Sequence, residues 1–298
     1  MKKKIILISS VLLCLMVNSN ATGAGSATGE FLNIGVGAKA AALGDSMTAR
    51  AEGTDAMYWN PSGLAGIKLP EATFSHTIWA LGTSQESAGF ALPLGEKTAL
   101  GVLVNYFSSG TMDKVDNTGL TTGAFSASDL SAAVCFSVKL TDNIPAGVSV
   151  KFISSSIDDV VGSAFAVDLG LQYILNNEIT FGAGVFNLGT NLKHSLVDES
   201  LPMNIKGGVL LKLFDASLSV DGVLPSAGSF SFSTGAEYAI SLSSDSTISA
   251  RVGYNSMVST GGLSAGAGFA IGNLNLDYAF LMFGDLGNNH RFSIKIKI

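Results

Sequence analysis

The sequence predicts an all-β protein: a transmembrane antiparallel β-barrel of about fourteen strands with a small N-terminal plug segment inside its lumen. Three observations predict this fold. The chain is apolar, with a mean hydropathy of +0.41 and 13% charged residues, yet no apolar run reaches the roughly 20 residues that a transmembrane helix needs. Short segments instead alternate between apolar residues and small or polar ones. Tyr and Phe recur near the segment ends, as in the interfacial girdles of membrane barrels.

The N-terminus has the three parts of a secretory signal peptide. Lysines at positions 2–4 form a basic region, residues 5–17 form an apolar region, and Ser19-Asn20-Ala21 is a small-residue cleavage site. We therefore expect residues 1–21 to be removed on export. The whole chain already has a net charge of −6, and losing three lysines makes it more acidic. Such a chain offers no basic surface for nucleic acid.

Residues 22–69 differ in kind from everything that follows. The stretch 33–66 is rich in Ala and Gly, lacks alternation, and closes on the aromatic pair Tyr58-Trp59 and the turn Asn60-Pro61. Its glycines, among them those at positions 35, 37 and 44, allow tight bends, and Asp55 is placed to cap a short helical turn through Trp59. A barrel of this size encloses more space than small side chains fill. We therefore expect this segment to plug the lumen, with residues 58–64 buried against the wall.

Residues 70–298 read as one barrel domain, because side chains on a strand point alternately to its two faces. The predicted strands cover residues 71–80, 85–95, 97–108, 127–141, 144–156, 162–176, 178–188, 201–214, 215–224, 229–241, 246–255, 262–272, 273–283 and 290–298. Short connections largely alternate with longer ones, as an up-and-down barrel requires. We expect the longer connections to be extracellular and the short ones periplasmic; the longer ones span residues 108–127, 158–162, 189–200, 255–261 and 284–289.

The less apolar face of these strands carries Gly, Ala and Ser with scattered charges, which suits a lumen. The charged positions are Lys151, Asp168, Glu237 and Asp277. Cys135, the one cysteine after the signal peptide, shares this face and is expected to be a small packed side chain.

A serine-hydrolase arrangement is the remote alternative. Residues 262–266 match G-x-S-x-G, and Asp277 and His290 follow in hydrolase order. A nucleophile elbow needs a strand-to-helix turn, however, whereas the alternation continues as a strand that points Ser264 inward and His290 outward. The three histidines lack metal-ligand spacing. We predict no catalytic residue, no metal and no cofactor.

The plug segment closely resembles the start of the PorV/PorQ family of outer-membrane proteins. The resemblance rests on FLNIGVGAKA at 31–40, ALG at 42–44 and DAMYWNPSGLA at 55–65, with later pieces such as RVGY at 251–254. More distantly, the chain is similar to the FadL family of outer-membrane transport proteins, which shares an asparagine-proline element in its plug. The resemblance implies a fourteen-stranded outer-membrane barrel of a Gram-negative bacterium with an N-terminal hatch. The hatch motif, a possible gate, then comprises Gly35, Gly37, Gly44, Asp55, Tyr58, Trp59, Asn60, Pro61, Gly63 and Leu64.

This resemblance implies two functions, which the sequence leaves near parity. One is a type IX secretion system component that receives secreted proteins, and the other is a channel for hydrophobic small molecules. The partners expected in both cases are outer-membrane lipid and the barrel-assembly machinery. The secretion role would add secretion components and secreted proteins as partners. The channel role would add hydrophobic small-molecule ligands. Two departures from the pattern are Ser62, where alanine is usual, and the terminal Ile298, where barrels commonly end in an aromatic residue.

Overall fold

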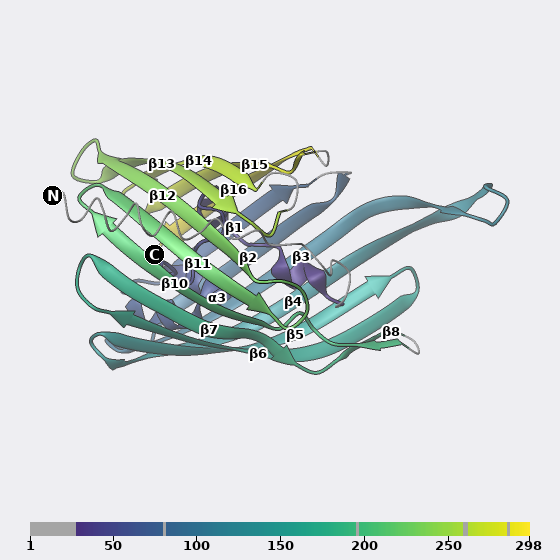
Figure 1. The fold of residues 1–298 in the computed structure, drawn as a ribbon, viewed down its shortest axis with the longest axis horizontal. Coiled ribbons are helices and arrows are strands. Elements are labelled where there is room, and N and C mark those ends of the chain that lie inside the picture. The colour runs from purple at the N-terminus through teal and green to yellow at the C-terminus, as the bar shows by residue number, and fades with distance from the viewer. Residues whose placement is uncertain (1–27, 80–81, 195–196, 259–261, 285–286) are drawn as a thin grey trace.

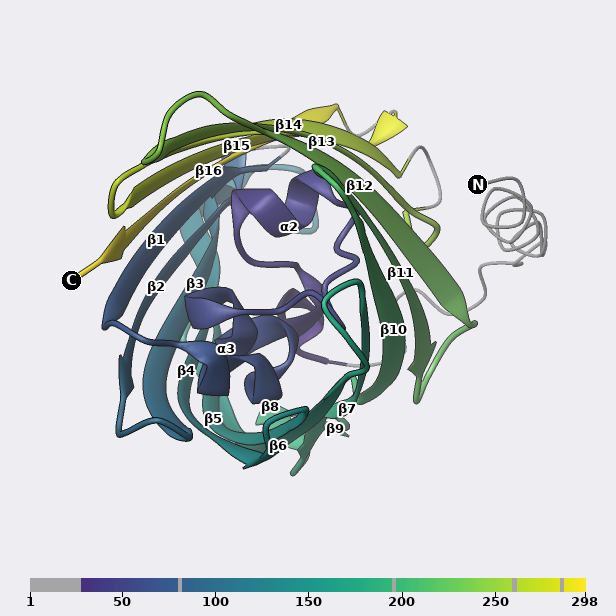
Figure 2. The ribbon, with the colours of Figure 1, turned by 90° about the vertical axis from the view of Figure 1, so that its left-hand side faces the viewer.

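A closed antiparallel barrel surrounds the N-terminal part of the chain. The computed structural model describes residues 28–298 except 80–81, 195–196, 259–261 and 285–286, so the predicted signal peptide, residues 1–21, lies outside the described residues. Fourteen strands close in the order β1-β16-β15-β14-β13-β12-β11-β10-β7-β6-β5-β4-β3-β2 (Figure 1). Residues 28–69, which we call the luminal segment, lie inside this ring of strands (Figure 2). The predicted fold class is confirmed.

The strands of the barrel follow one another in the chain with a single interruption. They are β1 (Glu71–Ile78), β2 (Ser84–Pro93), β3 (Thr98–Val115), β4 (Thr121–Thr141), β5 (Ile144–Ile157), β6 (Val160–Ile174), β7 (Ile179–Gly189), β10 (Asn204–Leu213), β11 (Ala216–Pro225), β12 (Ser231–Ser241), β13 (Ser246–Asn255), β14 (Leu263–Ile271), β15 (Leu274–Met282) and β16 (Asn288–Lys297). Between β7 and β10, β8 (Leu192–His194) and β9 (Val197–Glu199) form a separate two-stranded ribbon.

The two ends of the barrel differ. Connections at one end are short, such as residues 142–143 and 272–273, and we call it the short-turn end. Glu71 and Lys297, which begin β1 and end β16, pair with one another there. The opposite long-loop end carries the β7–β10 connection and the β3–β4 hairpin, which projects well beyond the other strands (Figure 1).

Two of the predicted loops are wrong in extent. Residues 108–127 form a hairpin that continues β3 and β4, with Thr111 opposite Ser126 and Val115 opposite Thr121. This ribbon is largely solvent-exposed, so it needs no apolar face and shows no clear alternation. Residues 158–162 are mostly strand as well, because a tight turn at Asp158, with φ 54, joins β5 to β6.

The outward face of the barrel is apolar. Its exposed large side chains include Phe74, Val102, Val104, Val134, Phe136, Val150, Phe165, Leu169, Val252 and Ile294. Inward positions carry small or polar residues, many of them buried serines, such as Ser131, Ser137 and Ser219. An apolar exterior around a polar interior is the pattern of a transmembrane barrel. None of the helices in the described part of the chain has the length and apolar character to cross a membrane.

The luminal segment is built of single helical turns. These are η1 (Glu30–Asn33), α2 (Ala38–Ala42), η2 (Gly53–Asp55), α3 (Ala56–Trp59) and η3 (Pro61–Gly66). Helices this short are unstable in isolation, so packing must hold them. Met57 and Leu64, for instance, are buried in one cluster with Leu103, Ala133 and Cys135 of the wall. The hydrophobic core therefore lies in the lumen, between the segment and the strands.

Candidate functional site

The luminal segment packs closely against inward-facing glycines of the barrel wall. A Cβ atom added to Gly170 would lie 2.1 Å from Asn60 Oδ1, and one added to Gly182 would lie 2.2 Å from the Thr48 carbonyl oxygen. The glycines that approach the segment in this way include Gly101, Gly147, Gly170, Gly182, Gly235, Gly253 and Gly266. They come from β3, β5, β6, β7, β12, β13 and β14, so the close fit extends around the barrel.

Asn60 ties the segment to the wall. Its side chain is fully buried, and Nδ2 donates to the carbonyl oxygens of Thr48 (2.7 Å) and of Leu171 on β6 (3.2 Å). Oδ1 accepts hydrogen bonds from the Ser62 amide (3.2 Å) and hydroxyl (2.7 Å). The bond from the amide caps the N-terminus of η3, which begins at Pro61. The prediction that residues 58–64 are buried inside the barrel is confirmed, with Tyr58 partly buried and the others buried.

The aromatic pair fastens the first part of the segment to α3. The Tyr58 and Trp59 rings meet edge to face, with centroids 4.9 Å apart. The Tyr58 hydroxyl lies 2.7 Å from the Leu32 carbonyl oxygen and 2.8 Å from that of Ile34, and Trp59 Nε1 donates to Val36 O (2.9 Å). Burial raises the pKa of the Tyr58 phenol, which keeps it protonated as a donor.

The predicted motif glycines serve two different purposes. Gly37 (φ 90) and Gly44 (φ 63) have left-handed backbones that a side chain would strain, so the bends expected there are confirmed. Gly35 is not left-handed; a Cβ there would lie 2.6 Å from Asp45 Oδ1. A Cβ at Gly63 would lie 2.0 Å from Ala51 O. These two positions need glycine for close packing.

The predicted capping role of Asp55 is wrong. Asp55 stands at the N-cap position of α3, but its side chain makes no capping hydrogen bond. Its carboxylate instead accepts from Lys295 Nζ of β16 at 2.8 Å. The ion pair across the lumen takes the carboxylate away from the helix start.

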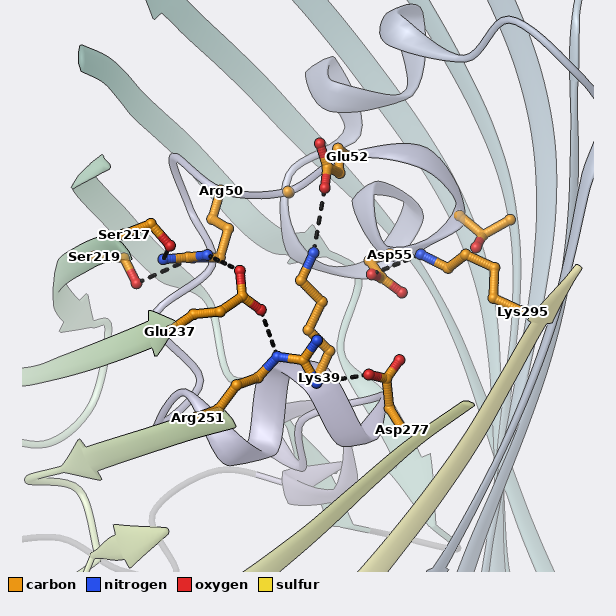
Figure 3. A network of polar contacts seen from close by, with 12 residues as sticks. Lys39, Arg50, Glu52, Asp55, Ser217, Ser219, Glu237, Arg251, Asp277 and Lys295 are labelled. Carbon is orange, nitrogen blue, oxygen red and sulfur yellow. Dashed lines mark hydrogen bonds and ion pairs between the residues drawn. The ribbon is translucent and has the colours of Figure 1, made fainter. Parts of the chain in front are cut away.

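A chain of buried charges joins the segment to three wall strands (Figure 3). Arg50 Nη1 lies 3.2 Å from Glu237 on β12, and its Nη2 donates to Ser217 Oγ at 2.9 Å. Glu237 also accepts from Arg251 of β13 (2.5 Å), which reaches Asp277 of β15 (2.6 Å). Each charge has an opposite neighbour, which is the condition for burying ions at tolerable cost.

Lys39 and Glu52 form a more exposed pair within the segment itself, 3.2 Å apart. Lys39 lowers the pKa of the Glu52 carboxyl to about 2. Because the Glu52 side chain is 67% exposed, solvent screening keeps the contribution of this pair to stability small.

Glu237 and Asp277 face the lumen, as strand alternation predicts, but their shared partner Arg251 was not predicted. Arg251 occupies an inward position of β13, so the same alternation could have identified it. Lys295, the partner of Asp55, lies on the inward face of β16. Arg50 carried no such signal, because the luminal segment has no regular period.

Cavities lie on opposite sides of the segment. A cavity of ≈550 Å³ opens at the short-turn end, where Lys39, Glu71, Arg251 and Lys295 help to line it. Two smaller cavities, of ≈40 and ≈10 Å³, lie toward the long-loop end. A cavity that binds benzene measures about 150 Å³, so neither small cavity admits an aromatic molecule while the segment is in place.

The hydrolase-like residues form no catalytic arrangement. The Ser264 hydroxyl is buried without a hydrogen-bond partner. Asp277 is paired with Arg251, and the His290 ring lies 2.8 Å from the Tyr278 hydroxyl. Cys135 is a buried free thiol, as predicted. Within the described ranges, no group of three or more His, Cys, Asp or Glu side chains is arranged to hold a metal ion.

Solved structures of the same architecture include a transporter and a channel. The Pseudomonas putida toluene transporter TodX aligns with a TM-score of 0.62 at 12% identity, over 88% of this chain and 96% of that one. The monoaromatic hydrocarbon channel CymD gives 0.61 at 13% identity, over 88% and 96%. A Pseudomonas aeruginosa FadL homologue gives 0.57 at 11% identity, over 87% and 97%. At these identities the likeness concerns the fold. No protein-family model and no curated protein matches the chain, and the PorV/PorQ assignment stays a prediction.

Replacing Gly170 with Ala is expected to destabilise the protein, because the new methyl group must displace Asn60. Overpacking of this kind costs about 1–3 kcal/mol. Chemical denaturation in detergent, followed by the fluorescence of the buried Trp59, measures the change. Gly207→Ala is the matched control, since a Cβ there has its nearest neighbour at 4.0 Å. Equal stability of the two variants would contradict the close fit.

Replacing Arg251 with Met is expected to be more damaging, because it leaves Glu237 and Asp277 buried without this partner. Breaking a buried ion pair costs about 3–5 kcal/mol, measured by the same denaturation. Lys114, on the projecting hairpin, forms an exposed ion pair with Asp158. Lys114→Met, which breaks this pair, is the control, and no measurable change in stability is expected. An Arg251→Met protein as stable as the control would show that the network is dispensable.

Proposed function

We propose that this protein is an outer-membrane channel for hydrophobic small molecules, gated by the luminal segment. The observation that carries the proposal is that the luminal segment fills the barrel and, apart from its chain connection to β1, is held there by non-covalent contacts. The fold adds support, because structures of this architecture include a toluene transporter and a monoaromatic hydrocarbon channel. In this reading the short-turn end faces the periplasm and the long-loop end faces the outside of the cell.

Passage requires the segment to move. The two cavities on its long-loop side are too small for an aromatic ring, and the wall glycines leave no gap around Asn60 and Pro61. An apolar molecule that leaves water for the interior gains about 25 cal/mol per Å² of buried surface. That gain can offset part of the cost of displacing the segment, whereas a polar solute has no comparable driving force.

The contacts of the segment suggest how the gate is held. Its attachment to β1 and its ion pairs to Glu237 and Lys295 lie on the short-turn side. The part before α2 is held by the aromatic pair, by the burial of Phe31 and Leu32 in a cluster with wall residues such as Ile153, and by single hydrogen bonds, such as the one from Asn204 Nδ2 to Asn33 Oδ1 (2.8 Å). We propose that residues 28–37 move first and that the hydrogen bonds of the Asn60 turn contribute most to holding the segment in place.

The type IX secretion role stays a prediction from the sequence resemblance. The contacts between the luminal segment and the wall do not bear on it, and the solved structures reported above are described as a toluene transporter, a monoaromatic hydrocarbon channel and a FadL homologue. We therefore favour the channel.

Cells that carry the protein are expected to take up toluene faster than a strain from which it has been deleted, because the channel offers the apolar molecule a route past the polar outer surface. Uptake of labelled toluene in deletion and complemented strains measures the difference. A small sugar serves as the polar control and should enter both strains equally. Unchanged uptake across a graded series of hydrophobic compounds would remove the transport proposal.

Replacing Asn60 with Ala is expected to open the gate more often, because the turn loses four hydrogen bonds. A net loss of about 1 kcal/mol for each of two bonds already raises the open fraction more than about tenfold. Conductance across planar bilayers reports this as more frequent openings to small ions. Asn117→Ala, at the exposed tip of the projecting hairpin, is the matched control. Identical conductance of the two variants would count against a gate at Asn60.

A further inference from the structure

The ≈40 Å³ cavity lies between the luminal segment and strands β10 to β13. A cavity that holds one water molecule needs about 10–15 Å³, so this space has room for water molecules or an ion. Asn33, Asp45 and Trp59 line it from the segment, and Asn204 and Asp221 are among the wall residues that face it.

Three oxygen atoms of these side chains are buried without a hydrogen-bond donor: Asp45 Oδ1, Asn204 Oδ1 and Asp221 Oδ1. Asn204 and Asp221 are each only 2% exposed. Leaving buried acceptors unpaired costs about 1–3 kcal/mol each, and more for a charged group. A ligand that satisfies all three at once would therefore bind with a large advantage.

Neighbouring contacts fix the orientation of the wall groups. Asn204 Nδ2 donates to Asn33 Oδ1 (2.8 Å) and Pro202 O (3.0 Å), both acceptors, so the amide cannot exchange its nitrogen and oxygen. Asp221 Oδ2 accepts from the Thr48 amide at 2.7 Å. The remaining oxygen of each side chain is thus left as an acceptor by its own hydrogen bonds.

Glycines make room for the two carboxylates. Asp221 Oδ1 lies 1.9 Å from the position of a Cβ on Gly208, and Asp45 Oδ1 lies 2.6 Å from that of Gly35. Asp45 itself has a left-handed backbone, φ 65, a conformation that costs a non-glycine residue energy and often marks a functional position.

Lys206 is the cation that lines the same cavity. Its ammonium lies 5.4 Å from the centroid of the Trp59 ring and 5.1 Å from that of Phe186. It therefore faces aromatic rings, and it donates to neither unpartnered carboxylate oxygen.

We propose that this cavity is a calcium site that ties the luminal segment to the barrel wall. Calcium prefers oxygen ligands from carboxylates, amide carbonyls and water, and Asp45, Asp221 and Asn204, which line the cavity together with Ser231 and Ser233, carry such oxygens. Asp45 belongs to the segment and the other ligands belong to the wall, so the bound ion bridges the two. Repulsion from Lys206 weakens binding, and we expect a Kd of about 10⁻⁴–10⁻³ M, the range of extracellular calcium modules.

Terbium luminescence tests the site directly, because Tb³⁺ takes calcium ligands and emits when an excited tryptophan is close. The chain has two tryptophans, of which Trp59 lines the cavity and Trp79 follows β1. The purified full chain in detergent, freed of divalent ions, should give saturable emission that Ca²⁺ suppresses better than Mg²⁺. Trp59→Phe should abolish the emission and Trp79→Phe should retain it.

Ligand variants make the assignment specific. Asp221→Asn should weaken Tb³⁺ binding at least about tenfold, since affinity follows the number of charged ligands, whereas Lys206→Met should strengthen it by removing repulsion. Calcium should also raise the unfolding midpoint of the wild-type chain but not that of Asp221→Asn. If Asp221→Asn does not fold, Ser233→Ala is measured in its place. Emission that needs Trp79 or ignores Asp221 would mean surface binding, and no saturable emission would mean a water-filled cavity. Either result overturns the proposal, and neither depends on transport.

Discussion

The close approach between the backbone of the luminal segment and the glycines of the barrel wall is the contact on which the rest of this structure depends. A fourteen-stranded ring whose inward residues are small cannot fill its own lumen. The segment fills it, but only because positions such as Gly147 and Gly170 carry no side chain. In return, the wall packs against the helical turns of the segment, which are too short to be stable in isolation. Neither part would be well formed alone.

Polar groups are treated differently on the two sides of the segment. Toward the short-turn end, the charges from Arg50 to Asp277 form a continuous series of opposite neighbours, and Asp55 is paired with Lys295. Toward the long-loop end, Lys151 is paired with Asp168 (2.7 Å), but Asp45, Asp221 and Arg291 keep buried polar atoms without partners. Unsatisfied buried groups persist where a ligand or a movement uses them. The short-turn side thus resembles a fixed anchor, and the long-loop side is the one suited to respond to what binds.

Much of the fold could be predicted because strand alternation is a local property. It gave the number of barrel strands, the inward position of Cys135, and the opposite faces of Ser264 and His290. Strand alternation did not predict the strands within residues 108–127, because a ribbon that is exposed on both faces has no apolar side and therefore no alternating pattern. The expected cap at Asp55 failed for another reason: a local rule was overridden by Lys295, a residue 240 positions away.

The sequence by itself determined which residues face the lumen, that the segment before the first strand is different, and that its Asn60-Pro61 turn belongs inside. Each of these follows from the period of the chain or from the chemistry of neighbouring residues. Only the tertiary structure decided which buried charges meet, as when Arg50 reaches Glu237, and which polar residues line the cavity beside Trp59. Such contacts depend on the register of every strand and on the closure of the ring, which no local pattern specifies.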